Sequence, residues 1–148
     1  MTAACKDCVA ELGADAYASP GRPRRRANHP GPRCMSHHRQ QINRQKELAW
    51  ARRILKEYGL TAEDYWRIYE HQGRRCALCQ RATGAVKKLA VDHDHRTGYV
   101  RGLCCGPCNH DVLGHSRDDV MFFRRGEQYL RNPPAHQLGI WARKEGDG

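Results

Sequence analysis

The sequence lacks any apolar run long enough to cross a membrane, and it is poor in apolar residues overall. Hydrophobic residues make up 39% of the 148 positions, and the chain has 2 phenylalanines. The first residues, MTAACKDCVAELG, also lack the basic and then apolar pattern of a secretory signal. These absences predict a cytosolic protein with a small core, in which bound metal ions contribute part of the stability.

Acidic residues are few relative to basic ones. The chain has 26 lysines and arginines against 16 aspartates and glutamates, which gives a net charge of +10. This balance favours attraction to a polyanion, above all to nucleic acid. It does not by itself indicate catalysis.

Cysteine, by contrast, is abundant. The chain has 8 cysteines, and in the cytosol, where disulfides are disfavoured, metal ligation is their expected use. Two Cys-x2-Cys pairs lie in the middle of the chain. Four thiolates suit zinc, and a closed four-cysteine site leaves the ion no open position for water, which predicts a structural ion. The predicted ligands are Cys76, Cys79, Cys105 and Cys108.

The second pair has an alternative interpretation, because its sequence CGPC is also the pattern of a thioredoxin-type redox pair. That motif needs a strand–helix context that is missing here, and another cysteine pair lies upstream, so zinc is favoured. Cys104 precedes the pair directly. Only Cys105 gives the Cys-x2-Cys spacing, so Cys104 is expected to be a spare thiol at a strand end.

A second candidate zinc site lies in residues 1–40, where a Cys-x2-Cys pair is followed by a Cys-x2-His pair. His38 is an alternative to the histidine of that pair. The segment between the pairs is rich in proline, glycine and arginine and predicts a basic loop, either against DNA phosphates or simply solvated. The competing interpretation is a disordered tail with scattered cysteines. The predicted ligands are Cys5, Cys8, Cys34 and His37.

Between the central cysteine pairs, the pattern predicts a β-hairpin followed by a helix. Residues 87–91 and 99–103 have the composition of short strands, joined by a turn at Thr97-Gly98. Residues 105–113 predict a short helix that Gly114 ends.

This order places Asp92 and His93 at the end of the first strand and Asn109 on the helix that faces it. A carboxylate and an amide oxygen can share a hard cation such as Mg²⁺, with positions left open for water and phosphate. An imidazole that titrates near neutrality can take a proton from an attacking water. An isolated Asp-His-Asp-His run is usually a solvated turn, but the flanking cysteine pairs and Asn109 favour a site here.

Helices are predicted on both sides of this centre. Residues 41–58 have apolar residues at helical spacing and a basic surface, and Gly59 is a typical helix end. That surface is expected either to lie across a phosphate backbone or to be solvated. Residues 61–72 predict a second helix, with Trp66 as a core or helix-packing residue. Residues 116–131 predict a third, capped by Ser116, packed on the hairpin and stopped by a proline pair.

The stretch VDHDHRTGYVRGLCCGPCN resembles the recombination endonuclease VII family, the phage-type members of the His-Me finger (HNH-like, ββα-metal) nucleases. The resemblance covers residues 58 to about 134, and its specific part is 76–114. The shared features are both cysteine pairs, the DHDH run, the Thr-Gly turn, Val-Arg-Gly-Leu, and asparagine directly after the last cysteine.

The resemblance implies roles for individual residues. Asp92 and Asn109 would bind the catalytic Mg²⁺ or Mn²⁺, and His93 would be the general base. His95 would lie in the site as a secondary histidine that orients the phosphate. Members of the family can carry an acidic residue a few positions after the asparagine, and the candidate here is Asp111. The central cysteines would hold structural zinc.

The resulting expectation is an α+β fold with a zinc-stabilised ββα-metal core, flanking helices and an N-terminal zinc-binding extension. The expected domains are the extension with its basic loop (1–40), a basic linker helix (41–60), an endonuclease VII-like nuclease domain (61–134) and a polar C-terminal tail (135–148).

The expected function is metal-dependent hydrolysis of DNA phosphodiester bonds, leaving 5′-phosphate and 3′-hydroxyl ends. By resemblance the substrate is branched DNA such as a Holliday junction, and the protein is phage-encoded and acts in the host cytoplasm. A nicking or homing-type nuclease is equally compatible with the chemistry, and a ribonuclease would differ only in substrate. A homodimer is one expectation, because resolving a junction takes two paired cuts. The alternative from another class is a non-catalytic, zinc-stabilised DNA-binding protein.

Overall fold

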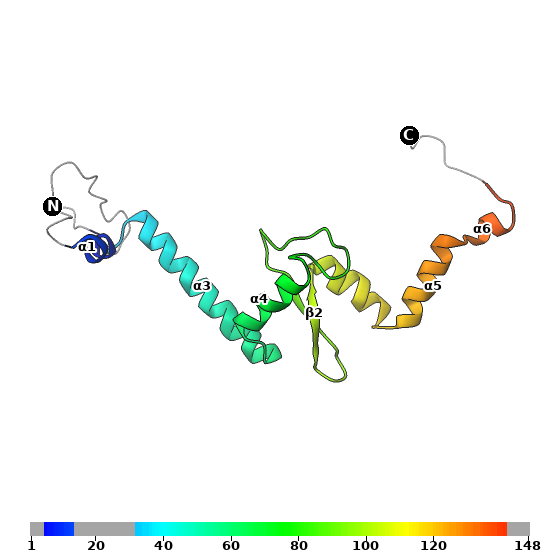
Figure 1. The fold of residues 1–148 in the computed structure, drawn as a ribbon, viewed down its shortest axis with the longest axis horizontal. Helices are drawn as coiled ribbons and strands as arrows, with labels where there is room; N and C mark the ends of the chain where they lie inside the picture. The colour runs from blue at the N-terminus through cyan, green and yellow to red at the C-terminus, as the bar shows by residue number, and fades with distance from the viewer. Residues whose placement is uncertain (1–4, 14–31, 142–148) are drawn as a thin grey trace. The chain divides into compact units, whose positions relative to one another are not determined.

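The computed structural model describes residues 5–13 and 32–141 of the chain (Figure 1). The chain is mostly helical, with one two-stranded hairpin, which confirms the α+β class. It forms two compact units, Met1–Ala62 and Glu63–Gly148. Most of the predicted basic loop lies outside the described residues. Within the described ranges, no helix is both long and apolar enough to cross a membrane.

The described residues of the first unit form two helices, α1 (Lys6–Leu12) and α3 (Met35–Tyr58). The helix predicted over residues 41–58 corresponds to α3. Its predicted start at residue 41 is wrong, because α3 begins at Met35, inside the Cys-x2-His pair. Its end is as predicted: Gly59 is left-handed, with φ 65°, and its N–H donates to the Leu55 carbonyl at 2.9 Å.

The second unit is built around an antiparallel hairpin of β1 (Ala90–His93) and β2 (Val100–Cys104). The first strand therefore begins at Ala90, later than predicted, and includes Asp92 and His93. The helices of this unit are α4 (Ala62–His71), the π-helix η1 (Cys108–Gly114), α5 (Val120–Arg131) and α6 (Pro134–Gln137).

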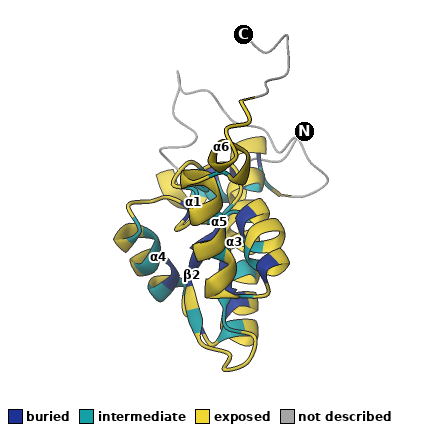
Figure 2. Cartoon of the chain, turned by 90° about the vertical axis from the view of Figure 1, so that its right-hand side faces the viewer, coloured by how far each residue is buried: buried dark blue, intermediate teal, exposed yellow. Residues whose placement is uncertain are grey.

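The core of this unit is small, as the composition predicts, and buried positions are few (Figure 2). Tyr65 of α4 is 1% exposed and its hydroxyl donates to the Leu89 carbonyl at 2.9 Å. Of the two predicted roles for Trp66, core or helix-packing residue, the core position is wrong. Its side chain is 42% exposed and contacts the rings of Tyr65 and Tyr69 edge-on from outside.

The π-helix η1 ends at Gly114, the predicted stop, but the chain remains helical beyond it. Helical backbone continues to Ser116, and the chain then turns through Arg117 and Asp118, both left-handed at φ 51° and 59°. Their N–H groups return to the carbonyls of Gly114 and Leu113. Aspartate tolerates this conformation better than most residues, so a glycine is not required to end the helix.

The predicted cap of the third helix also moves along the chain. Ser116 donates to the Leu113 carbonyl at 2.9 Å, while the side chain of Asp119 accepts from the N–H of Met121 at 2.8 Å and caps α5. No residue of α5 is buried. Only its beginning approaches the hairpin, where Val120 and Phe123 line a small hollow with Cys104.

Candidate metal centres and active site

The four central cysteines come together as a tetrad. The sulfur atoms of Cys76, Cys79, Cys105 and Cys108 all lie within 4.8 Å of one another. The loop around Cys76 is joined to the end of β2, because the Ala77 N–H donates to the Leu103 carbonyl at 3.1 Å and the Cys105 N–H donates to the Cys76 sulfur at 3.3 Å. The tetrad thus connects both ends of the segment that carries the hairpin.

The electrostatics of this tetrad favour a bound cation. Hydrogen bonds from the backbone N–H groups of Ala82 and Arg81 lower the pKa of the Cys79 thiol to about 6. Burial and the neighbouring thiols raise the pKa of Cys108. Because adjacent thiolates oppose each other's ionisation, four of them require a positive ion among them.

Cys104 lies outside the tetrad, in a buried position at the end of β2. Burial, and then the negative charges of Cys76 and Asp92, raise the pKa of its thiol to about 12. It is therefore a neutral, unreactive thiol at neutral pH.

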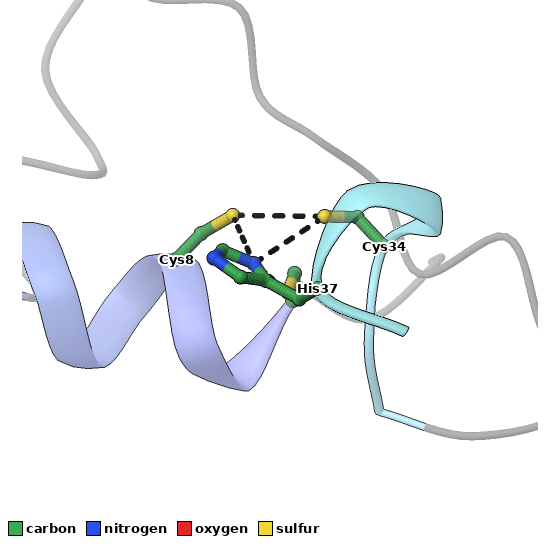
Figure 3. A group of neighbouring side chains, drawn as sticks. Cys8, Cys34 and His37 are labelled. Atoms are coloured by element: carbon green, nitrogen blue, oxygen red, sulfur yellow. Dashed lines mark hydrogen bonds between the residues drawn. The ribbon is translucent and has the colours of Figure 1, made fainter. Parts of the chain in front are cut away.

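The N-terminal tetrad is built from two helix starts (Figure 3). Cys5 is the N-cap of α1 and Cys8 lies in its first turn. Cys34 and His37 occupy the same two positions of α3. An N-cap residue and the third helical residue lie on the same side of a helix start, which explains the x2 spacing of both pairs. All four side chains are buried.

The imidazole of His37 completes this tetrad, and His38 does not belong to it. The Nδ1 atom of His37 lies 3.3 Å from the sulfurs of Cys5 and Cys8 and 3.4 Å from that of Cys34. Helix N–H groups favour thiolates here: a hydrogen bond from the His37 backbone is the main reason why the pKa of Cys34 is lowered.

A fifth residue, Glu11, belongs to this centre and was not predicted. Its Oε1 atom lies 3.1 Å from Nε2 of His37, on the side of the ring opposite the sulfurs. A carboxylate in this place fixes the tautomer that turns Nδ1 towards a metal. The only sequence signal was an acidic residue one helical turn after Cys8.

In the hairpin, Asp92 is paired with an arginine that the sequence analysis did not identify. Arg101 donates from Nε to Oδ2 of Asp92 at 2.8 Å and from Nη2 to Oδ1 at 2.9 Å. The Nη2 atom also donates to Asp118 at 3.0 Å. Asp92 is 8% exposed, so this carboxylate is largely removed from water.

The residues of the DHDH run have different contacts: Asp94 accepts hydrogen bonds within the turn, whereas His93 and His95 lie beside each other. The carboxylate of Asp94 accepts from the N–H groups of Arg96 and Thr97 at 2.8 and 2.9 Å, which shapes the turn and lowers the pKa of Asp94. The rings of His93 and His95 lie side by side, with their centroids 4.7 Å apart.

Asn109 lies in the first turn of η1, directly after Cys108, and its N–H donates to the Cys105 carbonyl at 2.9 Å. In the described part of the chain, no hydrogen bond joins its side chain to Asp92. Asp111 is exposed on η1. The acidic side chain that shares a hollow with Asp92 is Asp118 instead.

The profile of the family described as Recombination endonuclease VII matches residues 51–132. The chain belongs to the recombination endonuclease VII family. It is 51% identical over 135 residues to the "Gene 59 protein" of Mycobacterium phage L5, covering 90% of this chain and 77% of that protein. The "Gene 59 protein" of Mycobacterium phage D29 is also 51% identical, with 90% and 76% covered. No solved structure matches the chain.

Recombination endonuclease VII proteins are phosphodiester-hydrolysing nucleases that act on DNA, so the chain is an enzyme with DNA as its partner. The predictions of a nuclease and of phage relatives are thereby confirmed. Its two tetrads are consistent with structural zinc.

The structure gives a physical reason for the Val-Arg-Gly-Leu motif of this endonuclease VII family member. Arg101 grips Asp92, and Leu103 is fully buried in the core. Gly102 leaves room for the side chain of Gln72, since a Cβ there would lie 2.9 Å from its Oε1 atom. Three consecutive residues of β2 therefore serve the site, the end of α4 and the core.

Proposed function

We propose that this endonuclease VII family protein is a metal-dependent DNA endonuclease whose site is Asp92, His93 and Asn109, on a ββα-metal core of β1, β2 and η1. The main support is the place of these residues in the matched family segment and in its elements. Asp92 and His93 are consecutive at the end of β1, and Asn109 follows Cys108 of the four-cysteine tetrad directly.

The donor atoms fit a hard divalent cation. Each oxygen of Asp92 accepts one hydrogen bond from Arg101, which leaves a further lone pair on each. Carboxylate and amide oxygens are the ligands that Mg²⁺ and Mn²⁺ prefer. Asp92 and Asn109 would hold the ion, which when bound supplies electrostatic stabilisation of the charge that develops at the phosphate.

The histidines supply proton transfer and orientation. His93, at the end of β1, accepts a proton from the water that attacks phosphorus. His95, whose ring is 4.7 Å away between centroids, orients the phosphate. Attack opposite the 3′ oxygen breaks the P–O3′ bond, so the products carry 5′-phosphate and 3′-hydroxyl ends.

For the substrate we propose branched DNA, such as a four-way junction, on the strength of family membership. Helix α3 supports DNA binding through exposed basic residues, which are Arg44, Lys46, Arg52, Arg53 and Lys56. Paired cuts at a junction favour a homodimer. The exposed apolar side chains of α5, among them Phe122, Tyr129 and Leu130, offer a surface for it.

We also propose the domain organisation expected from the sequence, with a zinc-binding extension (1–40) that ends within α3, the basic remainder of that helix as a linker (41–60), a nuclease domain (61–134) and a polar tail (135–148). The boundary between the two compact units, at Ala62 and Glu63, is in keeping with it. As a relative of phage proteins, the enzyme would act in the cytoplasm of the host.

Cleavage assays with wild type and His93→Ala test this proposal. Supercoiled plasmid, a synthetic four-way junction and a matched RNA junction are incubated with Mg²⁺ or Mn²⁺, while gel shift and zinc analysis verify binding and folding. Wild type should cut DNA, and the variant should bind without cutting. Mild chelation should abolish cleavage and added Mg²⁺ restore it. If neither protein cuts in any metal but both bind, the protein is a zinc-stabilised DNA-binding module.

A further inference from the structure

We propose that Arg101, held by Asp118, is a positioning residue that fixes the Asp92 carboxylate in the orientation from which it binds a divalent cation. The inference rests on the proposed function, because it takes Asp92 to be a metal ligand. It adds two residues, Arg101 and Asp118, to the site.

The first observation is the geometry of the Asp92–Arg101 pair. Two parallel hydrogen bonds, of 2.8 and 2.9 Å, join the guanidinium to both carboxylate oxygens. A planar fork of this kind fixes the plane of a carboxylate as well as its position, which a single contact does not. Only 11% of the Asp92 side chain is exposed, so water is a poor substitute for these bonds.

The second observation is the irregular pairing of the strands at this place. Asp92 pairs with Gly102, but His93 pairs with Val100, which leaves Arg101 as the extra residue of a β-bulge. In regular pairing Arg101 would stand opposite His93 and would share the face of His93 rather than that of Asp92. The bulge therefore turns the guanidinium towards Asp92.

The third observation is the placement of Asp118. It accepts from Nη2 of Arg101 at 3.0 Å, and both it and Arg117 have a left-handed backbone that side chains rarely adopt. This backbone belongs to the end of the preceding helix, where the Asp118 N–H donates to the Leu113 carbonyl, so the turn itself fixes the place of Asp118 beside Arg101. The hollow that contains these groups is also lined by Leu113 and Phe123, and apolar walls strengthen the hydrogen bonds.

The charges of the group explain why an arginine does not exclude a cation. Asp118 balances Arg101, so the two carboxylates and one guanidinium carry a net negative charge. Arg101 uses one lone pair on each oxygen of Asp92, and the remaining ones stay available. Hydrogen bonds to ligand carboxylates are common around metal sites and tune metal affinity. If Arg101 instead occupied the cation's place, it would compete with the ion. Removing it would then strengthen metal binding, whereas the proposal expects weaker binding.

Binding of Mn²⁺ to the full-length, zinc-loaded protein tests the proposal by electron paramagnetic resonance. Wild type should bind an ion that Asp92→Asn loses. Arg101→Gln should weaken binding by on the order of tenfold. Arg101→Lys should restore only part of the affinity because it lacks the fork. Asp118→Asn should weaken binding less than Arg101→Gln. Arg125→Gln, which removes an exposed ion pair with Asp119, is the matched control and should change nothing.

Cleavage rates give a second readout. With excess Mn²⁺, Arg101→Gln should recover much of its kcat, while the Mn²⁺ concentration for half-maximal rate rises. Tighter or unchanged Mn²⁺ binding in a folded Arg101→Gln protein overturns the proposal. If that variant loses zinc or fails to melt cooperatively, Arg101→Lys and Asp118→Asn decide, and wild-type affinity in both overturns it. If wild-type binding does not depend on Asp92, the proposed function itself fails.

Discussion

The side chain of Gln72, just after α4, pairs with both backbone polar groups of Leu103. Its Oε1 atom accepts from the Leu103 N–H at 2.8 Å and its Nε2 donates to the Leu103 carbonyl at 2.9 Å. The amide thus takes the place of a third strand beside β2. It also connects the helix before the cysteine tetrad to the strand that carries Arg101.

Gly102→Ala should disturb this arrangement. The new Cβ would lie 2.9 Å from Oε1 of Gln72 and displace the amide, leaving the N–H of Leu103 without its partner, while the Leu103 carbonyl keeps the N–H of Ala77. We expect a loss of about 1–2 kcal/mol in the free energy of unfolding, measured by chemical denaturation. In a Gln72→Ala background the same substitution should cost little, because the bonds are already absent. Gly126→Ala, where nothing lies within 4 Å of the added Cβ, is the control. Full additivity of the two substitutions would contradict the explanation.

Cys104 and Cys105 are neighbours in sequence with opposite expected effects on zinc. Cys105→Ala should remove one zinc ion per chain, because it deletes a ligand of the tetrad. Cys104→Ala should keep the full zinc content, measured by elemental analysis of the purified protein. Burial raises the pKa of the Cys104 thiol to about 12, so the thiol is neutral at pH 8 and alkylation should require unfolding. Loss of zinc from Cys104→Ala would show that Cys104, and not Cys105, is the zinc ligand.

His37 and His38 give a similar pair of variants in the first unit. His37→Ala should release the N-terminal zinc, because its Nδ1 is the atom that faces the three sulfurs. His38→Ala should retain it. The four-cysteine site serves as an internal reference, since its zinc should stay in both variants. Equal zinc loss in both would mean that the two histidines exchange places.

Glu11→Gln should weaken the N-terminal site without abolishing it. The carboxylate lies 3.1 Å from Nε2 of His37, and partners of this kind change metal affinity by roughly tenfold to a hundredfold. Competition with a calibrated chelator would measure the change, with the four-cysteine site again as reference. Wild-type affinity in Glu11→Gln would mean that Glu11 merely lies close to the ring.

The members of the two tetrads could be predicted from sequence because their signal is local. The x2 spacing is that of two positions on one helix start or one tight loop, and it does not depend on the rest of the fold. The same spacing identified Cys105, rather than Cys104, as a member of the central tetrad. Helix ends were less predictable: α3 begins at Met35 because Cys34 and His37 hold its first turn, whereas apolar periodicity becomes visible only further along.

Contacts between distant residues could not be predicted in this way. The pairing of Arg101 with Asp92 depends on a β-bulge, and the residue pattern of the two strands does not predict one. The contact with Asp118 depends on where the preceding helical segment ends. The sequence predicted an end at Gly114, but helical backbone continues to Ser116. Trp66 was expected to be a core or helix-packing residue, but it is Tyr65 of α4 that is buried, next to Leu89, and Trp66 is largely exposed.

Because Cys34 and His37 lie at the start of α3, the helical content of α3 should depend on whether the N-terminal centre holds a metal ion. The first turn has no side-chain cap, so an ion bound by Cys34 and His37 together with the cysteines of α1 would supply much of its order. Stripping the ion should unwind this end of the helix while leaving the stop at Gly59 in place. Far-ultraviolet circular dichroism would then follow metal occupancy of the N-terminal centre in real time, without any attached label.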